Sequence, residues 1–345
     1  MNRLLFLIAF FVTSSGFSQE NLKNYLLLGI ERAEEITSVY TAPLTEGLVY
    51  ALAGGWSNVA TVNKPWQVTL AIKSNGSFIP EDKLSYTLDL ERFENVTVIG
   101  DADSIEIPTI VGSTEQSETI VVTIDGREFQ FDAPTGTGLL SVNLLPSAFL
   151  QAEVGLPYHS EFGVRYFPRI TVGDVKFGII GAGAKHQFSE WIGFLRDSPI
   201  AMSTDISFTQ LNTDYFFERD GLVPGTNQRI DAQVNSWLFQ LSTSTKFKRY
   251  NAYVGLGYLT GNSDYVFRGD YRIETPIRVI EYQDPFDVQN TESHWRANIG
   301  GMAQFGWFSV NLDYTFQGYN NVSLGLNFDV FTPKEKIENP PDDDR

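Results

Sequence analysis

The chain offers few side chains that could act together in catalysis. It contains three histidines and no cysteine, whereas a hydrolase needs a base and a nucleophile within hydrogen-bond reach. Serines lie close to the histidines in three pairs: His159–Ser160, His186–Ser189 and Ser293–His294. Adjacent residues on a strand face opposite sides, so Ser293 and His294 are poorly placed for proton transfer. No third orienting group is identifiable, and we predict no catalytic residue and no enzymatic activity.

Cofactor and metal signatures are also missing from the sequence. There is no P-loop, no dinucleotide-binding fingerprint and no clustered metal-ligand pattern. Asp101, Asp103 and Glu106 resemble an oxygen-rich calcium loop, but the features of the twelve-residue calcium-binding loop are absent. Solvated loop acids are the simpler interpretation. We therefore predict no cofactor and no metal, and the ligand-binding residues stay unknown.

The composition restricts the class of protein and its partners. The formal net charge of −17 and the isoelectric point near 4.6 argue against a nucleic-acid partner. We interpret the acidity as solubilising charge on exposed loops. Hydrophobic residues make up 42 % of the chain, which resembles a soluble protein. A membrane barrel has the same composition, because half of each strand faces water.

The clearest structural pattern lies at residues 307–331. Apolar residues alternate there with small, polar or acidic residues in two runs, separated by a turn at Tyr319-Asn320-Asn321. Each run therefore has one apolar and one polar face over about ten residues, which is typical of a strand that crosses a bilayer. Strands of soluble proteins are usually shorter, at five or six residues. The apolar positions are Phe308, Val310, Leu312, Tyr314 and Phe316, then Val322, Leu324, Leu326, Phe328 and Val330.

Similar alternation recurs over much of residues 57–331. We predict an all-β membrane protein, an antiparallel transmembrane β-barrel of about 12–14 strands. The pattern weakens from Glu91 to Gly138, which we interpret as irregular strands with long loops, partly folded into the lumen; a separate small β subdomain is the alternative. Residues 187–196 do not follow this alternation and fit a short interfacial helix at the membrane boundary, where Trp is favoured.

The lengths of the connections support the barrel. In a bacterial barrel the periplasmic turns are short and the external loops are longer. If the last strand ends in the periplasm at Phe331, the joints near Gly306 and at Lys248-Arg249 are periplasmic, and both are short. The external joints at residues 212–231 and 261–293 are long, and only the last external loop is short. A soluble β-sandwich is not expected to show this alternation of short and long connections.

The two ends of the chain differ from the barrel region. Residues 1–19 have a positive start, a short apolar core and small residues near Phe17, as in a cleaved signal peptide. Residues 20–56 form a predicted helical N-terminal hatch, in which Ala42-Pro43 ends or restarts the helix. The hatch is predicted to be a plug, in the lumen or across the periplasmic mouth; a helix packed outside the barrel is the alternative. Residues 332–345 are predicted to form an acidic disordered tail.

Three stretches resemble a family of uncharacterised outer-membrane β-barrels of Bacteroidota. The first runs from Tyr40-Thr41-Ala42-Pro43 through Gly47 to Gly54-Gly55-Trp56. The second is Gly181-Ala182-Gly183-Ala184-Lys185-His186 followed by Trp191-Ile192, and the third is the aromatic-ended final strand. More distantly, a helical hatch before a barrel is similar to the outer-membrane transporters of long-chain fatty acids and hydrocarbons. That resemblance implies passage of hydrophobic solutes, although no ligand-contact residue can be carried over.

These observations lead to one expected function and two alternatives. The favoured function is a passive channel or transporter for small hydrophobic molecules in the outer membrane of a Gram-negative cell. A structural or adhesion barrel is the second hypothesis, with a partner bound by extracellular residues 261–293, including Tyr265, Tyr271 and Tyr282. A membrane hydrolase is the third. The expected partners are membrane lipid, the barrel-insertion machinery and a hydrophobic small-molecule ligand.

Overall fold

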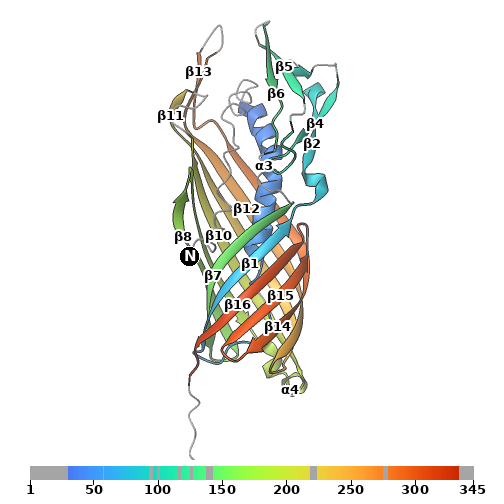
Figure 1. The fold of residues 1–345 in the computed structure, drawn as a ribbon, viewed down its shortest axis with the longest axis vertical. Helices are drawn as coiled ribbons and strands as arrows, with labels where there is room; N and C mark the ends of the chain where they lie inside the picture. The colour runs from blue at the N-terminus through green and yellow to red at the C-terminus, as the bar shows by residue number, and fades with distance from the viewer. Residues whose placement is uncertain are drawn as a thin grey trace, which may run out of the picture.

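Ten antiparallel strands form a closed barrel (Figure 1). The computed structural model describes residues 30–56, 58–92, 96–98, 102–115, 118–124, 127–136, 143–217, 224–274 and 279–333. Strand β1 pairs with β7 and with β16, and β11 pairs with β12, so the hydrogen bonding runs around the whole wall. The wall strands are β1 (Val68–Phe78), β7 (Leu144–Leu156), β8 (Ser160–Val172), β9 (Val175–His186), β10 (Ile200–Phe216), β11 (Gly225–Thr245), β12 (Tyr250–Glu274), β14 (Asp287–Phe305), β15 (Phe308–Phe316) and β16 (Asn321–Phe331).

The wall has fewer strands than the 12–14 that the sequence predicts. The remaining described strands lie outside it: β2 (Ser85–Asp89) pairs with β4 (Ser104–Pro108), and β3 (Val96–Val98), β5 (Thr119–Ile124) and β6 (Arg127–Asp132) form a second small sheet. Strand β13 (Val279–Gln283) pairs only with β12. Alternation identifies a strand but not the sheet that it joins, so the sequence does not distinguish these strands from those of the wall.

The two ends of the barrel differ in their connections. One end, here called the turn end, carries the joints at residues 157–159, 187–199, 246–249 and 306–307. The other, the loop end, carries β2 to β6, β13 and two short turns. The short helices η2 (Glu81–Lys83) and η3 (Leu90–Arg92) lie in the loop-end segment; η4 (Phe188–Trp191) and α4 (Gly193–Arg196) lie at the turn end, where a helix was predicted. Figure 1 shows β2, β4, β5 and β6 gathered at the loop end, at the same height as β11 and β13.

Burial across the wall is inverted relative to a soluble protein. Outward side chains are apolar and exposed, such as Leu256 at 65 % and Trp295 at 78 %, whereas inward Ser203 and Thr315 are fully buried. Lipid outside and a polar interior require this pattern. On β14, the exposed rings of Trp295 and Phe305 are ten residues apart, which for a tilted strand is roughly 25 Å, the height of the lipid-facing band.

Helix α3 (Ile30–Ala53) is continuous through Pro43, whereas the sequence predicted an end or a restart there. Proline removes one helical hydrogen bond, the one to the Val39 carbonyl, and two neighbouring carbonyls of the helix accept hydrogen bonds from outside the helical backbone pattern. Thr41 Oγ1 donates to the Thr37 carbonyl at 2.7 Å, and the amide of Ile110 donates to the Tyr40 carbonyl at 3.0 Å. Among the described residues, no helix is long and apolar enough to span a membrane.

Two apolar clusters fill the interior. One surrounds the second half of α3 inside the wall and includes Tyr50 and Leu52. The other joins the first half of α3, through Ala33 and Ile36, to the loop-end strands. The described part of residues 261–293 is therefore mostly strand, not loop: it continues β12, forms β13 and begins β14. Tyr265 and Tyr271 are buried in this second cluster, and Tyr282 packs against it.

Some predictions fall outside the described residues. These are the signal peptide at 1–19, the first part of the hatch at 20–29 and nearly all of the tail at 332–345.

Candidate functional site: the lumen and its helix

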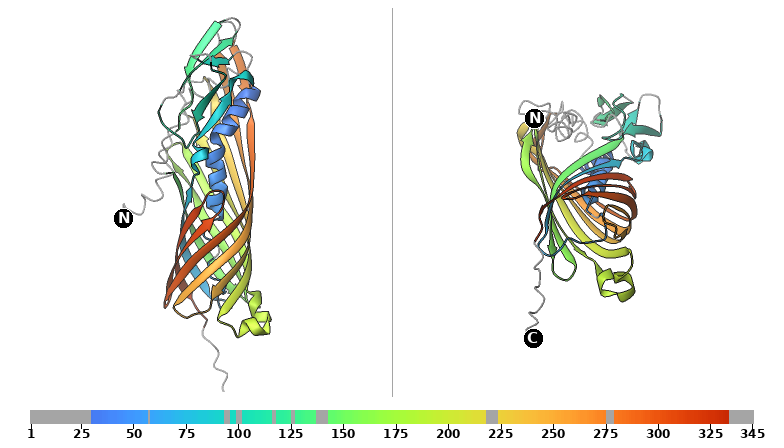
Figure 2. Two further views of the ribbon diagram at one scale, coloured as in Figure 1. Left: turned by 90° about the vertical axis from the view of Figure 1, so that its right-hand side faces the viewer. Right: turned by 60° about the horizontal axis from the view of Figure 1, so that its bottom comes forward.

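Helix α3 occupies the lumen of the barrel (Figures 1 and 2). It contacts β1, β7, β10, β11, β12 and β14, which lie on opposite sides of the wall. The hydroxyl of Ser236 donates to the Val49 carbonyl at 2.9 Å, and Gly47 packs closely against Leu145 and Tyr319. Of the positions considered from the sequence, the structure places this helix inside.

Two arginines of the wall cap the C-terminal end of α3. Arg165 Nη1 donates to the Leu52 carbonyl at 2.9 Å, and its Nη2 donates to the Gly54 carbonyl at 3.1 Å. Arg296 Nη1 donates to the Ala53 carbonyl at 3.3 Å. The last carbonyls of a helix have no partner within the helix, and they form the negative end of its dipole. Both guanidinium groups therefore donate hydrogen bonds to carbonyls at the end of the helix, and their positive charge complements the negative end of the helix dipole.

Arg165 is held between two aromatic rings. Its guanidinium carbon lies 4.2 Å from the ring centroid of Trp56 and 4.2 Å from that of Phe149. Gln151 Oε1 accepts from Arg165 Nε at 3.2 Å and from Nη2 at 2.9 Å. The indole N–H of Trp56 donates to Thr209 Oγ1 at 2.8 Å. Cation–π contacts and four hydrogen bonds thus fix a completely buried side chain.

The chain after the helix continues down the lumen to the turn end. The Ala60 amide donates to Ser244 Oγ at 2.9 Å, and the Val62 amide donates to Gln187 Oε1 at 3.2 Å. The Asn63 amide donates to Glu161 Oε2 at 2.9 Å. These side chains belong to different wall strands or to the turn beyond β9, so the extended segment is fastened across the lower lumen.

Buried charges in the lumen are balanced. The described residues include four buried acids and four buried bases, so they sum to zero. Lys185 Nζ and Glu161 Oε1 form an ion pair at 3.1 Å, and Lys73 Nζ donates to Asn327 Oδ1 at 2.7 Å. Pairing and hydrogen bonding are what permit such burial. The eight residues are Glu153, Glu161, Asp205 and Asp313, with Lys73, Arg165, Lys185 and Arg296.

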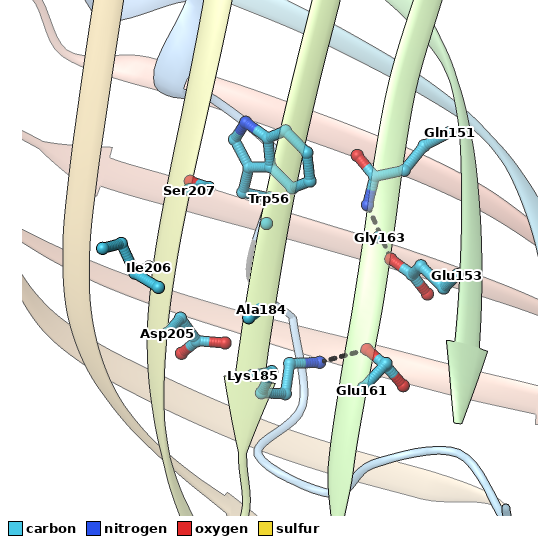
Figure 3. Close-up of a pocket in the computed structure, with 11 residues that line it drawn as sticks. Trp56, Gln151, Glu153, Glu161, Gly163, Ala184, Lys185, Asp205, Ile206 and Ser207 are labelled. Atoms are coloured by element: carbon cyan, nitrogen blue, oxygen red, sulfur yellow. Dashed lines mark hydrogen bonds and ion pairs between the residues drawn. The ribbon is translucent and has the colours of Figure 1, made fainter. Parts of the chain in front are cut away.

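A polar cavity lies below Trp56. Figure 3 shows Glu153 and Glu161 on one side of it and Asp205 on the other, with Lys185 reaching toward Glu161. Its empty space is about 300 Å³, including space open to solvent. A polar lining of this kind favours ordered water. Trp56 and wall residues line the cavity, and none of these lining residues belongs to α3.

The histidines lie in different parts of the described chain, and one of them contacts a serine. Ser160 Oγ lies 3.0 Å from His186 Nδ1, a pairing across β8 and β9 that the sequence spacing did not predict. The ring of His186 packs edge-on against Trp191 at 5.4 Å, and no carboxylate contacts it within the described chain. His294 forms a 3.4 Å pair with Glu292. The structure therefore gives one serine–histidine contact without an orienting acid.

The candidate calcium ligands are only partly within the described residues. Asp101 lies outside the described residues, and Glu106 accepts a short hydrogen bond from Ser85. No group of three or more potential metal-ligating side chains occurs in the described ranges.

Sequence reasoning missed the two capping arginines. A signal for Arg165 was nevertheless present. Phe162, Val164 and Tyr166 mark the lipid face of β8, so the residue between the last two must point inward. A cation at an inward position requires a buried acceptor, but the sequence does not reveal that the acceptor is the end of a helix.

This chain belongs to a family of unknown function, DUF6588, whose model matches residues 1–330. No curated protein matches the sequence. Solved structures with a similar arrangement include the translocator domain of the autotransporter NalP from Neisseria meningitidis, at 10 % identity. That match covers 86 % of this chain and 98 % of that one, with a TM-score of 0.33.

Two further solved structures illustrate the range of similar proteins. The β domain of the Bordetella autotransporter BrkA is 10 % identical, covering 76 % of this chain and 99 % of its own, with a TM-score of 0.28. The TodX monoaromatic hydrocarbon channel ΔS2 mutant is 8 % identical, covering 80 % and 93 %, with a TM-score of 0.24. With scores this low, the architecture rests on the strand pairing of this chain.

Proposed function

We propose that this protein is an outer-membrane barrel that displays a binding domain at the cell surface while its lumen stays closed. The observation that carries the proposal is the apolar cluster that joins α3 to the loop-end strands. Because the same helix fills the lumen and supports the loop-end core, the barrel serves as a base for that core. The Glu46–Lys83 ion pair, at 2.9 Å, adds a polar link between them.

The charge of the loop-end segment indicates the class of partner. Residues 79–143 hold thirteen Asp or Glu and three Lys or Arg, a net charge of −10 out of −17 for the chain. A surface of one sign steers partners of the opposite sign and repels others. The partner we propose is therefore a protein or peptide with a basic surface, bound at the loop end.

A deletion separates this function from the barrel itself. Phe78 pairs with Leu144 across β1 and β7, so a short turn can replace residues 79–143 without altering the wall register. In vesicles, the full chain is expected to bind a defined lysine-rich peptide at least tenfold more tightly than the deletion variant. A glutamate-rich peptide of the same length is the control. Equal binding of the lysine-rich peptide by both proteins would contradict the proposal.

Passage of small hydrophobic molecules is the second candidate function. It would require α3 to leave the lumen, and only non-covalent contacts hold the inner end of this helix. A Cβ on Gly54 would lie 2.8 Å from Asn75 Cγ, so Gly54→Cys with Asn75→Cys can form a disulfide in a chain without other cysteines. If withdrawal of α3 opens the barrel, fatty-acid uptake into liposomes should stop on oxidation and return on reduction. Gly54→Cys alone is the control. Uptake no better than with empty liposomes, in the reduced state, would exclude this candidate.

The cellular location follows from the same proposal. We place the barrel in the outer membrane of a Gram-negative bacterium of the Bacteroidota, exported with a cleaved signal peptide and inserted by the barrel-insertion machinery. Membrane fractionation and the mass of the mature N-terminus test this placement. Recovery of the uncleaved chain in the soluble fraction would refute it.

A further inference from the structure

A basic and aromatic projection extends from the turn end of the barrel. It consists of residues 188–199, which contain η4 and α4, together with the turn at residues 246–250, and is here called the apron. In Figures 1 and 2, α4 lies beside and below the wall. Four large rings on the apron are more than half exposed: Trp191 at 63 %, Phe194 at 79 %, Phe247 at 59 % and Tyr250 at 62 %.

Hydrogen bonds and an ion pair within the protein hold the apron in place. Lys246 Nζ donates to the Arg196 carbonyl at 2.9 Å and to the Leu195 carbonyl at 3.3 Å, and it pairs with Glu190 at 3.3 Å. The amide of Met202 donates to Ser189 Oγ at 3.1 Å, with Ser189 fully buried. Internal contacts therefore satisfy the polar groups of the segment and leave its rings facing outward.

The charge of the apron is opposite to that of the whole protein. Lys246 and Glu190 neutralise each other, which leaves exposed Arg196, Lys248 and Arg249 against exposed Asp197. The remaining net charge is +2 (three bases minus one acid), in a chain of net charge −17. Exposed aromatic rings beside exposed cations are typical of surfaces that enter the boundary between lipid headgroups and acyl chains.

We propose that the apron binds an anionic phospholipid of the leaflet that surrounds the turn end. The apron rings continue the lipid-facing surface of the wall, because Tyr250 begins β12 and Ile200, itself 42 % exposed, begins β10. The rings enter the headgroup boundary, and the three cations contact the phosphate and the anionic headgroup. This inference rests on the membrane placement of the barrel and not on the binding function proposed for the loop end.

A single cysteine gives a direct test, since the chain has none of its own. The labelled protein carries Phe194→Cys with an environment-sensitive fluorophore and is placed in phosphatidylcholine vesicles. Brominated phosphatidylglycerol or brominated phosphatidylcholine is then added at the same low mole fraction. We expect quenching by the anionic lipid to indicate about fivefold local enrichment, the preference that one basic side chain near an anionic surface gives. The same label at Glu115→Cys, at the loop end, should not be quenched by either lipid.

Two further measurements make the test decisive. Arg196, Lys248 and Arg249 are changed together to Gln, and the matched control changes Arg127, Lys176 and Arg272 to Gln at the loop end. The apron variant should lose the headgroup preference and the control should keep it. For the parent protein, high salt should also reduce the preference, because it screens surface charges.

Two results would overturn the inference. Equal quenching by the two brominated lipids would show contact with lipid but no recognition of its charge. No quenching by either would show that the rings face water and await a protein partner. A loss of peptide binding at the loop end would change neither measurement, so the two proposals fail independently.

Discussion

Arg165→Met tests whether the wall holds the lumen helix in place. Arg165 donates to the Leu52 and Gly54 carbonyls, and a hydrogen bond from a charged donor contributes about 1.5–3 kcal/mol. The loss of two such bonds costs about 3–6 kcal/mol. Removing a buried charge and admitting water offset part of this cost. We therefore expect the end of α3 to open more easily by about 3 kcal/mol.

Hydrogen exchange measures this opening directly. A change of about 3 kcal/mol corresponds to roughly a hundredfold faster exchange of the amides in the last two turns of α3, while the wall amides keep their protection. The matched control is Arg169→Met on the same strand, where the side chain is 48 % exposed and pairs with Asp214. It should leave α3 unchanged. Exchange of α3 within threefold of the parent rate in Arg165→Met would refute the capping role.

Three further predictions concern other parts of the molecule. A Cβ on Gly183 would lie 2.9 Å from Trp56 Cζ3, so Gly183→Ala should destabilise the barrel by about 1–3 kcal/mol in urea, and an unchanged midpoint would contradict this packing. The Gly269 amide and Arg268 hold the pKa of Asp284 below its usual range. Ionised Asp284 thus stabilises its hairpin above about pH 4 and loses this effect as the pH falls through the lowered pKa. Protection of the Gly269 amide from hydrogen exchange should fall over the same pH range in the parent protein, whereas in Asp284→Asn it should not change over that range. Finally, the folded barrel should migrate differently on a gel before and after boiling, and identical migration would exclude a stable closed wall.

The sequence predicts the alternation within the wall strands well, though not their number, because lipid imposes a local rule. Each membrane strand must alternate, and the partners of β15 and β16 follow from a four-residue connection: Leu312 pairs with Leu324, and Asp313 with Ser323. The alternation of short and long connections is similarly local, since it depends only on the spacing between alternating runs. The periodic pattern therefore contains both the strand register and the end at which each connection lies.

The contents of the lumen were harder to predict because they depend on distant contacts. Pro43 is a helix breaker in local terms, but contacts of the surrounding barrel and loop-end chain keep α3 continuous. Tyr265 and Tyr271 resemble exposed loop aromatics in the sequence, yet they belong to a buried core that includes β5 and α3. Arg165 acquires its partner from a residue more than a hundred positions away. None of these contacts produces a periodic pattern in the sequence.

The energy of withdrawing α3 distinguishes the two candidate functions. Val49 and Leu52 belong to the lumen cluster and are each at most 2 % exposed, and full burial of such a side chain contributes about 1.5–3 kcal/mol. Exposing these two alone costs about 3–6 kcal/mol, which limits a spontaneously open state to about one molecule in a hundred or fewer. A channel of this design would need a partner that extracts the helix. Display of the loop-end core needs the helix where it already lies, and this cost is our reason for proposing surface binding ahead of passive transport.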